Sequence, residues 1–254
     1  MAVAGLSDCV FYHSMDLPIS GSPEGHWDLR GRFDDYISRT PVRGKSVLDV
    51  GAASGFLSFE AEKRGANVIS IDASTARQWD RVPFLNSMHA LDYGAWVEKV
   101  EKYLDDIKRS YWLAHRELRF TNKVYYGNAY ELPSELGTFD VVLIGQILVH
   151  LRDVVRALSS IAARCGDTLV IAEGMIENPE PISRWLARAD HPENDYSFWH
   201  HSTGLYRELL SILGFELQSK ENRNYRCNLE GSADGVSITT PVFKRRNASP
   251  RAAT

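Results

Sequence analysis

Two glycines and one acid have the spacing of a ligand-binding loop. Gly51 and Gly55 enclose residues 52–54, which are two alanines and a serine, and so small a turn lets backbone N–H groups come close to a ligand. Asp72 lies 72 − 51 = 21 residues after the first glycine, at the end of the next apolar run. A carboxylate at that spacing typically accepts hydrogen bonds from the two hydroxyls of a ribose. The pattern predicts a site for a ligand that contains a ribose.

Three further residues are candidates for catalysis. His150 titrates near neutral pH and could remove a proton from a hydroxyl or amine acceptor. Gln146 lies four residues earlier, so on a helix the two would share a face and Gln146 could orient the acceptor. His13 is a third catalytic candidate, near the N-terminus. The alternative for His150 is a purely structural role, which is the commoner one for a lone histidine in an apolar helix.

These residues need a parallel sheet to bring them together. Apolar runs predict five buried strands, at residues 46–50, 67–71, 123–126, 139–144 and 168–172. Helices are expected at 56–64, 145–151 and 203–213, and a final antiparallel hairpin at 215–219 and 235–244. The carboxyl ends of parallel strands meet at one edge of an open α/β sheet, and ligands bind there. The candidate residues are therefore expected at that edge.

The loop sequence separates two families of nucleotide-binding folds. A dinucleotide site has the pattern G-x-G-x-x-G, whereas residues 51–55 read G-x-A-x-G after the strand that contains Asp49. Together with Asp72, this pattern resembles the class I S-adenosylmethionine (SAM)-dependent methyltransferases, over about residues 27–244. The resemblance implies an α/β, Rossmann-like class I methyltransferase fold: a seven-stranded, mostly parallel sheet with a C-terminal antiparallel hairpin and helical cap insertions. An NAD-binding enzyme is a weaker alternative.

The resemblance also implies a set of cofactor contacts. Asp72 would bind the ribose, Asn128 the adenine amino group, and Arg30 the methionine carboxylate of SAM. Two alternatives stay open: Arg30 as the cap of a surface helix at 32–38, and Asn128 as an Asx-turn residue. The residues expected to bind SAM are Arg30, Asp49, Gly51, Ala52, Ala53, Gly55, Asp72, Ala73, Asn128, Ala129, Gly145 and Gln146.

Two short runs point to a narrower group. The segments 27–30 (WDLR) and 145–152 (GQILVHLR) look like those of the bacterial tRNA wobble-uridine (carboxy)methyltransferase-like group. The activity that the resemblance favours is methyl transfer from SAM, and the acidic balance and the aromatic residues of the insertion favour a small-molecule acceptor over tRNA. Two alternatives remain: another reaction of SAM, such as carboxymethyl transfer or displacement within SAM itself, and a non-catalytic SAM-binding regulator.

Three segments lie outside the plain alternation of strands and helices. Residues 1–44 form an N-terminal arm and lid, residues 45–244 the catalytic domain, and residues 245–254 a tail that is expected to be disordered. From Asp72 to Val124 is 124 − 72 = 52 residues, whereas one crossover needs only about a dozen. A cap insertion is therefore expected at about 76–122. The alternatives are a mobile, non-functional tail for the arm and a helix packed on the sheet for the insertion. The substrate is expected to meet Tyr12, Trp199 and His200.

The composition limits the partners. The 254 residues carry a net charge of −4, which gives no basic footprint for nucleic acid, so a small-molecule acceptor is favoured over tRNA. The three cysteines are scattered and odd in number, as is typical of free thiols in a reducing compartment, so a cytoplasmic location is expected. No metal site is expected, because the cysteines are widely scattered. No membrane span is expected either, because no apolar run approaches the required length of about 18 residues.

Overall fold

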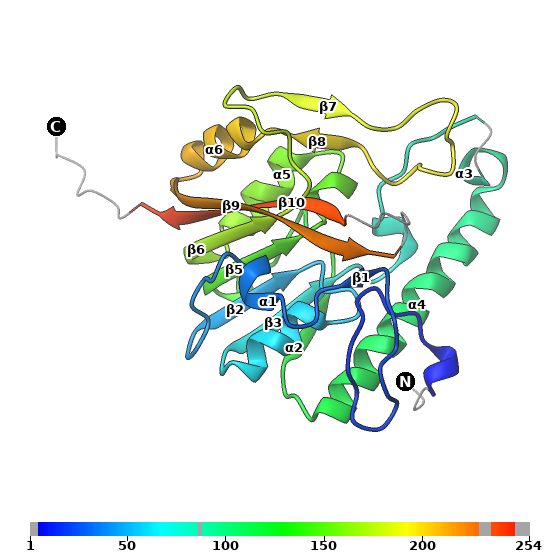
Figure 1. Cartoon of the computed structure of the whole chain (residues 1–254). Helices are drawn as coiled ribbons and strands as arrows, with labels where there is room; N and C mark the ends of the chain where they lie inside the picture. The colour runs from blue at the N-terminus through cyan, green and yellow to red at the C-terminus, as the bar shows by residue number, and fades with distance from the viewer. Residues whose placement is uncertain (1–4, 86–87, 229–234, 247–254) are drawn as a thin grey trace, which may run out of the picture.

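Eight strands form one central sheet. The computed structural model describes residues 5–85, 88–228 and 235–246, and within them the strands lie in the order β1–β9–β10–β6–β5–β2–β3–β4 (Figure 1). The parallel strands are β2 (Ser46–Val50), β3 (Asn67–Asp72), β4 (Lys123–Tyr126), β5 (Phe139–Gly145) and β6 (Cys165–Ala172). The antiparallel hairpin consists of β9 (Phe215–Cys227) and β10 (Val236–Arg245), and β10 pairs with β6.

This topology confirms the predicted Rossmann-like class I methyltransferase fold and adds one edge strand. The five parallel strands and the C-terminal hairpin are those expected, although β9 continues to Cys227 where the prediction ended at Ser219. The eighth strand, β1 (Trp27–Asp28), belongs to the N-terminal arm and pairs antiparallel with the end of β9. This long-range pairing, with Trp27 opposite Cys227, leaves no local signal in the sequence.

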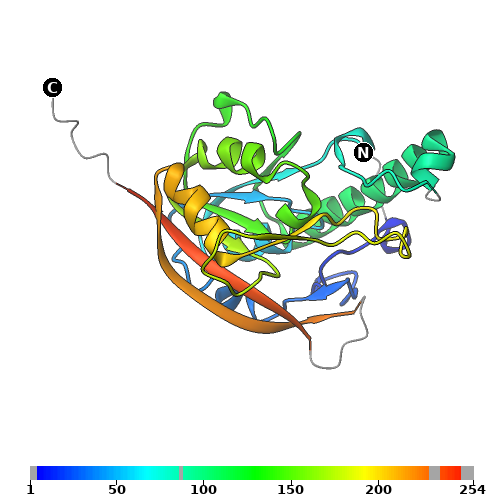
Figure 2. The ribbon, with the colours of Figure 1, turned by 90° about the horizontal axis from the view of Figure 1, so that it is seen from above.

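Alternate side chains of the central strands divide the core into two layers. On β5, Val141 and Leu143 belong to one apolar cluster, and Val142 and Ile144 belong to the other. The helices of the first layer are α2 (Phe56–Lys63) and part of α4 (Tyr93–Leu118), and those of the second are α5 (Val154–Ala162) and α6 (Thr203–Ile212). Figure 2 shows α5 and α6 together on one side of the sheet. Burial on both faces is the reason that the strands are nearly continuous apolar runs.

The insertion between β3 and β4 is dominated by α4. Asp92 caps this helix by accepting a hydrogen bond from the Ala95 N–H at 2.9 Å. The C-terminal half packs on the sheet, where Tyr111 is fully buried. The N-terminal half projects past the sheet (Figure 1) and forms a separate apolar cluster through Trp96, Val100 and Leu104 with Ala76 of η2 (Ala76–Gln78). A short helix, α3 (Met88–Leu91), precedes it. The packed-helix alternative thus describes the C-terminal half of α4, and a capping role for the N-terminal half stays a prediction.

The described part of the N-terminal arm is packed against the rest of the chain. It contains η1 (Leu6–Asp8) and the short helix α1 (Phe33–Tyr36), and its buried apolar residues Phe11, Met15 and Leu17 join the core cluster of α2. The Val10 N–H donates to the Asp106 carbonyl of α4 at 3.2 Å, and the His13 N–H donates to Ser54 Oγ at 3.0 Å. A mobile tail is therefore the wrong alternative for these residues.

The segment after β5 differs from its predicted form. Gly145 is the last residue of β5, and residues 146–153 are irregular apart from the 3-10 turn η4 (Leu148–His150), whereas a helix was expected from Gly145. The helix α5 begins later because Asp153 caps it, accepting a hydrogen bond from the Arg156 N–H at 2.9 Å. Gln146 has a positive φ of 52°, which no α-helical residue adopts. Gln146 and His150 therefore do not share a helical face.

The C-terminal end of the fold also extends further than predicted. Arg245, expected in a disordered tail, is the last residue of β10, and its guanidinium donates to the carbonyls of Ala162 and Cys165. Arg246 follows, with its N–H donating to the Gly214 carbonyl at 2.8 Å, and residues 247–254 of the expected tail lie outside the described residues. β10 therefore ends at a residue that is anchored to α5 and β6.

A second, two-stranded sheet lies beside the main one. Its strands β7 (Ser183–Trp185) and β8 (Trp199–His201) are antiparallel, and the Ile176 N–H, in the segment that follows β6, donates to the His201 carbonyl at 3.0 Å. The turn η3 (Ser134–Leu136) precedes β5.

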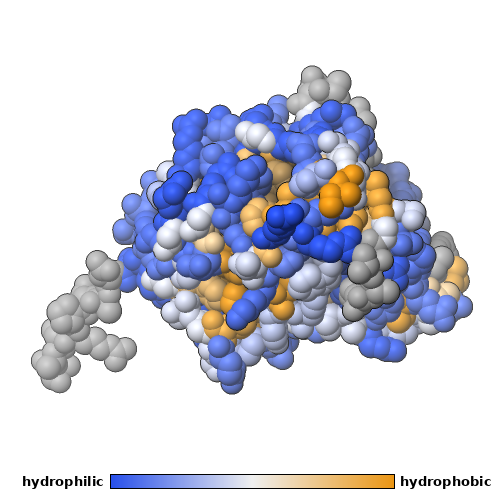
Figure 3. Space-filling model, turned by 90° about the horizontal axis from the view of Figure 1, so that it is seen from below, coloured by the Kyte–Doolittle hydropathy of each residue, from blue (hydrophilic) through white to orange (hydrophobic). Residues whose placement is uncertain are grey.

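Among the helices of the described ranges, none is long and apolar enough to cross a membrane. Figure 3 shows a face on which hydrophilic residues surround smaller apolar areas.

Candidate functional site

The loop between β2 and α2 is held open by backbone geometry. Gly51, Ala53 and Gly55 all have positive φ angles, of 83°, 47° and 91°. A Cβ atom on Gly55 would lie 2.5 Å from the Phe59 ring, and one on Gly51 would lie 2.9 Å from Ile147. Only glycine fits these two positions, which is why the predicted spacing fixes the course of the loop.

Asp72 ties this loop to the end of β3. Its Oδ2 accepts a hydrogen bond from the Ala53 N–H at 2.5 Å, and its Oδ1 accepts one from the Ala73 N–H at 2.7 Å. Burial raises the pKa of this carboxyl, while the two N–H groups and the Lys108 ammonium oppose the rise. A carboxylate oxygen has more than one lone pair, so both oxygens can still accept from the hydroxyls of a ribose.

A pocket opens beside this carboxyl, between the glycine loop and α4. Its lining is mostly small or apolar and comes from three directions: Ala52, Ala53, Asp72 and Ala73 from the loop and β3, Leu104, Ile107, Lys108 and Tyr111 from α4, and Val124 and Tyr126 from β4. Apolar walls with one carboxyl at the rim suit a flat base attached to a ribose. The structure thus brings together four of the residues predicted to bind SAM.

Asp49 lies under the loop, outside the lining of this pocket. It is fully buried, and its Oδ2 accepts a hydrogen bond from Ser58 Oγ at 2.6 Å. Its Oδ1 has no hydrogen-bond partner among the described residues. Burial raises the pKa of Asp49 to about 7, so this group is near its titration point at neutral pH. Direct contact between Asp49 and a cofactor stays a prediction.

Asn128 and Ala129, predicted to contact the adenine, follow β4 but do not belong to the pocket lining. The Asn128 Oδ1 accepts a hydrogen bond from the Tyr130 N–H at 2.9 Å, which is the local Asx geometry of the alternative. The same oxygen was expected to read the adenine amino group. That contact therefore remains a prediction, and it requires the second lone pair of this oxygen.

The ends of β5 and β6 place Gln146 beside Gly174. The Gln146 side-chain Oε1 accepts a hydrogen bond from the Gly174 N–H at 3.4 Å. The backbone N–H of Gln146 donates to the Ala172 carbonyl at 2.9 Å. Gly145 packs closely against Tyr36, since a Cβ atom there would lie 3.2 Å from the Tyr36 hydroxyl. The sequence did not point to Tyr36, because it lies in the arm and 145 − 36 = 109 residues away from Gly145.

His150 has a ring nitrogen suited to a general base. Its Nδ1 lies 2.8 Å from the Tyr196 carbonyl oxygen. A carbonyl can only accept, so Nδ1 carries the proton and Nε2 holds a lone pair in the neutral ring. Burial lowers the pKa of His150, and the positive charge of Arg81 lowers it further. His150 is therefore neutral at pH 7 and able to accept a proton at Nε2.

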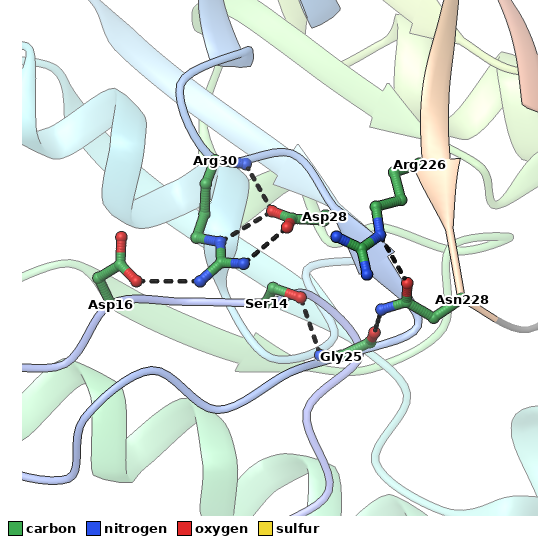
Figure 4. Close-up of polar contacts among 7 residues, drawn as sticks. All are labelled: Ser14, Asp16, Gly25, Asp28, Arg30, Arg226 and Asn228. Atoms are coloured by element: carbon green, nitrogen blue, oxygen red, sulfur yellow. Dashed lines mark hydrogen bonds and ion pairs between the residues drawn. The ribbon is translucent and has the colours of Figure 1, made fainter. Parts of the chain in front are cut away.

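Arg30 is engaged by two carboxylates of the arm. Its Nε and Nη2 donate to the two oxygens of Asp28 at 2.9 and 2.6 Å, and its Nη1 donates to Asp16 at 3.1 Å (Figure 4). Figure 4 also shows Asn228 donating to the Gly25 carbonyl, which ties the arm to the end of β9. Arg30 does not cap a helix, since α1 begins at Phe33 after the N-cap Arg32. Its pairing with a methionine carboxylate stays a prediction that requires competition with Asp28.

His13 and Tyr12 lie near the start of α2. The His13 ring is buried 5.7 Å from the Phe56 ring, and burial lowers its pKa to about 3, so it is neutral. Tyr12 packs edge-on against it, with ring centroids 5.0 Å apart. Burial raises the pKa of Tyr12, and the hydroxyls of Tyr103 and Tyr196 add to the rise. The structure thus places Tyr12 and His13 side by side, against the start of α2.

The remaining predicted substrate residues, Trp199 and His200, lie on β8. The Trp199 ring packs edge-on against Trp185 at 4.9 Å. The His200 Nδ1 lies 3.1 Å from Arg184 Nη2, which can only donate, so Nε2 carries the proton of the neutral ring. A Cβ atom on Gly174 would lie 3.6 Å from that Nε2. His200 therefore reaches the segment after β6 as a hydrogen-bond donor, whereas the free nitrogen of the neutral His150 ring is an acceptor.

Comparison with curated proteins finds partial relatives. No family model matches the chain. It is similar to the ubiquinone biosynthesis O-methyltransferase of Aliivibrio fischeri (strain ATCC 700601 / ES114), 28% identical over 149 residues, which are 54% of this chain and 51% of the relative. The enzyme of the same name from Aeromonas salmonicida (strain A449) is 26% identical over 149 residues, covering 54% and 50%. The chain thus spans about half the length of the curated relatives that it matches.

Solved structures extend the likeness to most of the chain. Magnesium protoporphyrin IX methyltransferase from Synechocystis PCC 6803 with bound SAH matches with a TM-score of 0.55 and 14% identity, over 86% of this chain and 82% of that one. A SAM-dependent methyltransferase from Mesorhizobium loti matches with a TM-score of 0.55 and 16% identity, over 85% and 100%. At such identities the likeness concerns the fold, and it agrees with the strand order: the chain has the class I SAM-dependent methyltransferase fold.

Proposed function

We propose that this chain is a SAM-dependent methyltransferase that acts on a small-molecule acceptor. The observation that carries the proposal is the Asp72 carboxyl, held by the Ala53 and Ala73 N–H groups at the rim of an apolar pocket. The Synechocystis enzyme with this fold was solved with bound SAM and with bound SAH. The glycine spacing and the acid at the end of β3 favour the same cofactor for this chain.

Bound SAM would supply a methyl group on a sulfonium whose leaving thioether is neutral, so the donor side needs no acid. The residues of this chain would first align the acceptor with the methyl group, an effect that intramolecular models value at roughly 7–11 kcal/mol. The Nε2 of His150 would then accept the proton of a hydroxyl or amine acceptor, a contribution of about 10²–10⁴-fold in rate. The Tyr196 carbonyl would stabilise the protonated ring through Nδ1.

The small-molecule acceptor is supported by two observations. The net charge of −4 does not favour a polyanionic partner such as a nucleic acid. The relatives are named for ubiquinone biosynthesis, and a structural neighbour is named for magnesium protoporphyrin. Membership of the tRNA wobble-uridine group and a cytoplasmic location remain predictions from the sequence.

One assay tests the function and its alternatives. The purified protein is incubated with SAM and candidate acceptors, and the sulfur-containing product is identified by mass spectrometry. S-adenosylhomocysteine is the product expected for methyl transfer, while methylthioadenosine would indicate displacement within SAM. SAM binding without turnover would support a regulator, and preferential binding of NAD would contradict the cofactor itself.

A further inference from the structure

A buried arginine lies in an aromatic compartment beside His150. The guanidinium carbon of Arg81 is 5.2 to 5.4 Å from the ring centroids of Trp79, Trp96 and Tyr196. Its side chain is only 9% exposed. Arg81 Nη1 donates to the Asp195 Oδ1 at 2.8 Å, so the arginine connects the insertion to the β7–β8 connection. No local pattern in the sequence indicates this contact, because its two partners are 114 residues apart.

Asp195 accounts for only part of the hydrogen-bonding capacity of the Arg81 guanidinium. A guanidinium has five N–H donors, and the Arg81 Nε is buried with no hydrogen-bond partner among the described residues. Buried donors almost always have a partner, because an unpaired one loses its hydration without compensation. Burial lowers the pKa of Arg81 although Asp195 opposes the shift. The unpaired donor points to an acceptor group that a ligand supplies.

The compartment lies between the candidate base and the candidate cofactor pocket. The Tyr196 ring is 5.6 Å from the His150 ring, and the Tyr196 carbonyl holds the His150 Nδ1. On the other side, Tyr103 of α4 packs edge-on against Trp79 at 6.1 Å. Tyr103 directly precedes Leu104, which lines the pocket together with Asp72. A ligand bound at Arg81 would therefore lie near both His150 and the cofactor.

We infer that Arg81 binds the carboxylate of an aromatic acceptor, whose ring packs among Trp79, Trp96 and Tyr196. The inference rests on the proposed function and names the substrate class of that site. A guanidinium matches a carboxylate in geometry, and its two nitrogens Nε and Nη2 form one edge of the fork that a carboxylate prefers. Aromatic side chains supply flat, apolar contact surface for a ring. Asp195 holds the arginine in place and offsets part of its charge.

The test compares variants of Arg81 and of Asp195, the two residues of the ion pair. The protein is saturated with S-adenosylhomocysteine and titrated with benzoate, 4-hydroxybenzoate and 2-naphthoate, and with their neutral carboxamides. At least one acid should bind about ten-fold tighter than its amide, the scale of one hydrogen bond to a charged group. Arg81→Met should abolish this preference, whereas Asp195→Asn should keep or strengthen it, because it removes a competing carboxylate.

A purely structural ion pair predicts a different pattern. In that case Arg81→Met and Asp195→Asn would lower the melting temperature together, and neither would change the ratio of acid to amide affinity. Arg188→Met is the matched control, since Arg188 pairs with Asp190 on the surface of the same connection. Should Arg81→Met fail to fold, two measurements still test whether Arg81 binds a carboxylate. They are the preference of the wild-type protein for an acid over its amide and the effect of Asp195→Asn on that preference.

Two results would overturn the inference while leaving the proposed function intact. One is a protein that binds S-adenosylhomocysteine but prefers none of the three acids over its amide. The other is a loss of the preference in Asp195→Asn as large as in Arg81→Met. A protein that binds no S-adenosylhomocysteine would instead contradict the proposed function, so the two failures are distinguishable.

Discussion

Replacing Asp72 by alanine tests the cofactor site most directly. The carboxyl accepts hydrogen bonds from the Ala53 and Ala73 N–H groups, and we expect it to accept from the ribose as well. A hydrogen bond to a charged group contributes about 1.5–3 kcal/mol, so the affinity for S-adenosylhomocysteine should fall about 10- to 150-fold in calorimetric titration. Asp72→Asn should lose less of this affinity, because its side-chain carbonyl oxygen can still accept hydrogen bonds. Some loss remains, because its NH₂ group would face one of the two N–H donors.

A second acid on the same sheet separates a loss of affinity from a loss of stability. Asp140 on β5 also accepts a backbone hydrogen bond, from the Ser46 N–H at 2.8 Å, and one from Ser46 Oγ at 2.9 Å. It lies at the amino end of β2, away from the pocket. Asp140→Ala should therefore lower the melting temperature and leave the affinity unchanged. Equal affinity for wild-type protein and a folded Asp72→Ala variant would refute the assignment of the ribose site.

Three further predictions concern the base, the loop and the pH dependence of stability. His150→Ala should lower turnover about 100-fold or more with cofactor affinity nearly intact, whereas His191→Ala, an exposed loop variant, should change neither. Gly55→Ala should lower the free energy of unfolding by about 1–3 kcal/mol more than Gly44→Ala in urea titration, because both positions have positive φ but only the first lacks room for a Cβ. The folded-state pKa of Asp49 is raised to about 7, so the folded chain binds this proton more tightly than the unfolded chain. The free energy of unfolding should then fall as the pH rises from about 4 to 7, and Asp49→Asn should flatten that part of the profile.

Local patterns in the sequence were sufficient for the sheet and the glycine loop. A buried strand, a turn that needs glycine, and an acid at the end of the next strand all lie within about 30 residues, and each follows from the residues themselves. The structure accordingly places Ala52, Ala53, Asp72 and Ala73 together in one pocket. The start of α5 was also encoded locally, because Asp153 is a typical N-cap residue. The prediction of a helix from Gly145 missed this signal.

Contacts between distant segments could be decided only by the tertiary structure. Arg30 looked available for a cofactor, but it is paired with Asp28 and Asp16. The tautomer of His150 depends on the carbonyl of Tyr196, 46 residues away. Nothing in the residues near Arg81 indicated that it would be buried against Asp195. The physical reason is common to all three: burial and pairing depend on where separate segments meet in space, and the period of a single strand or helix carries no information about its partners.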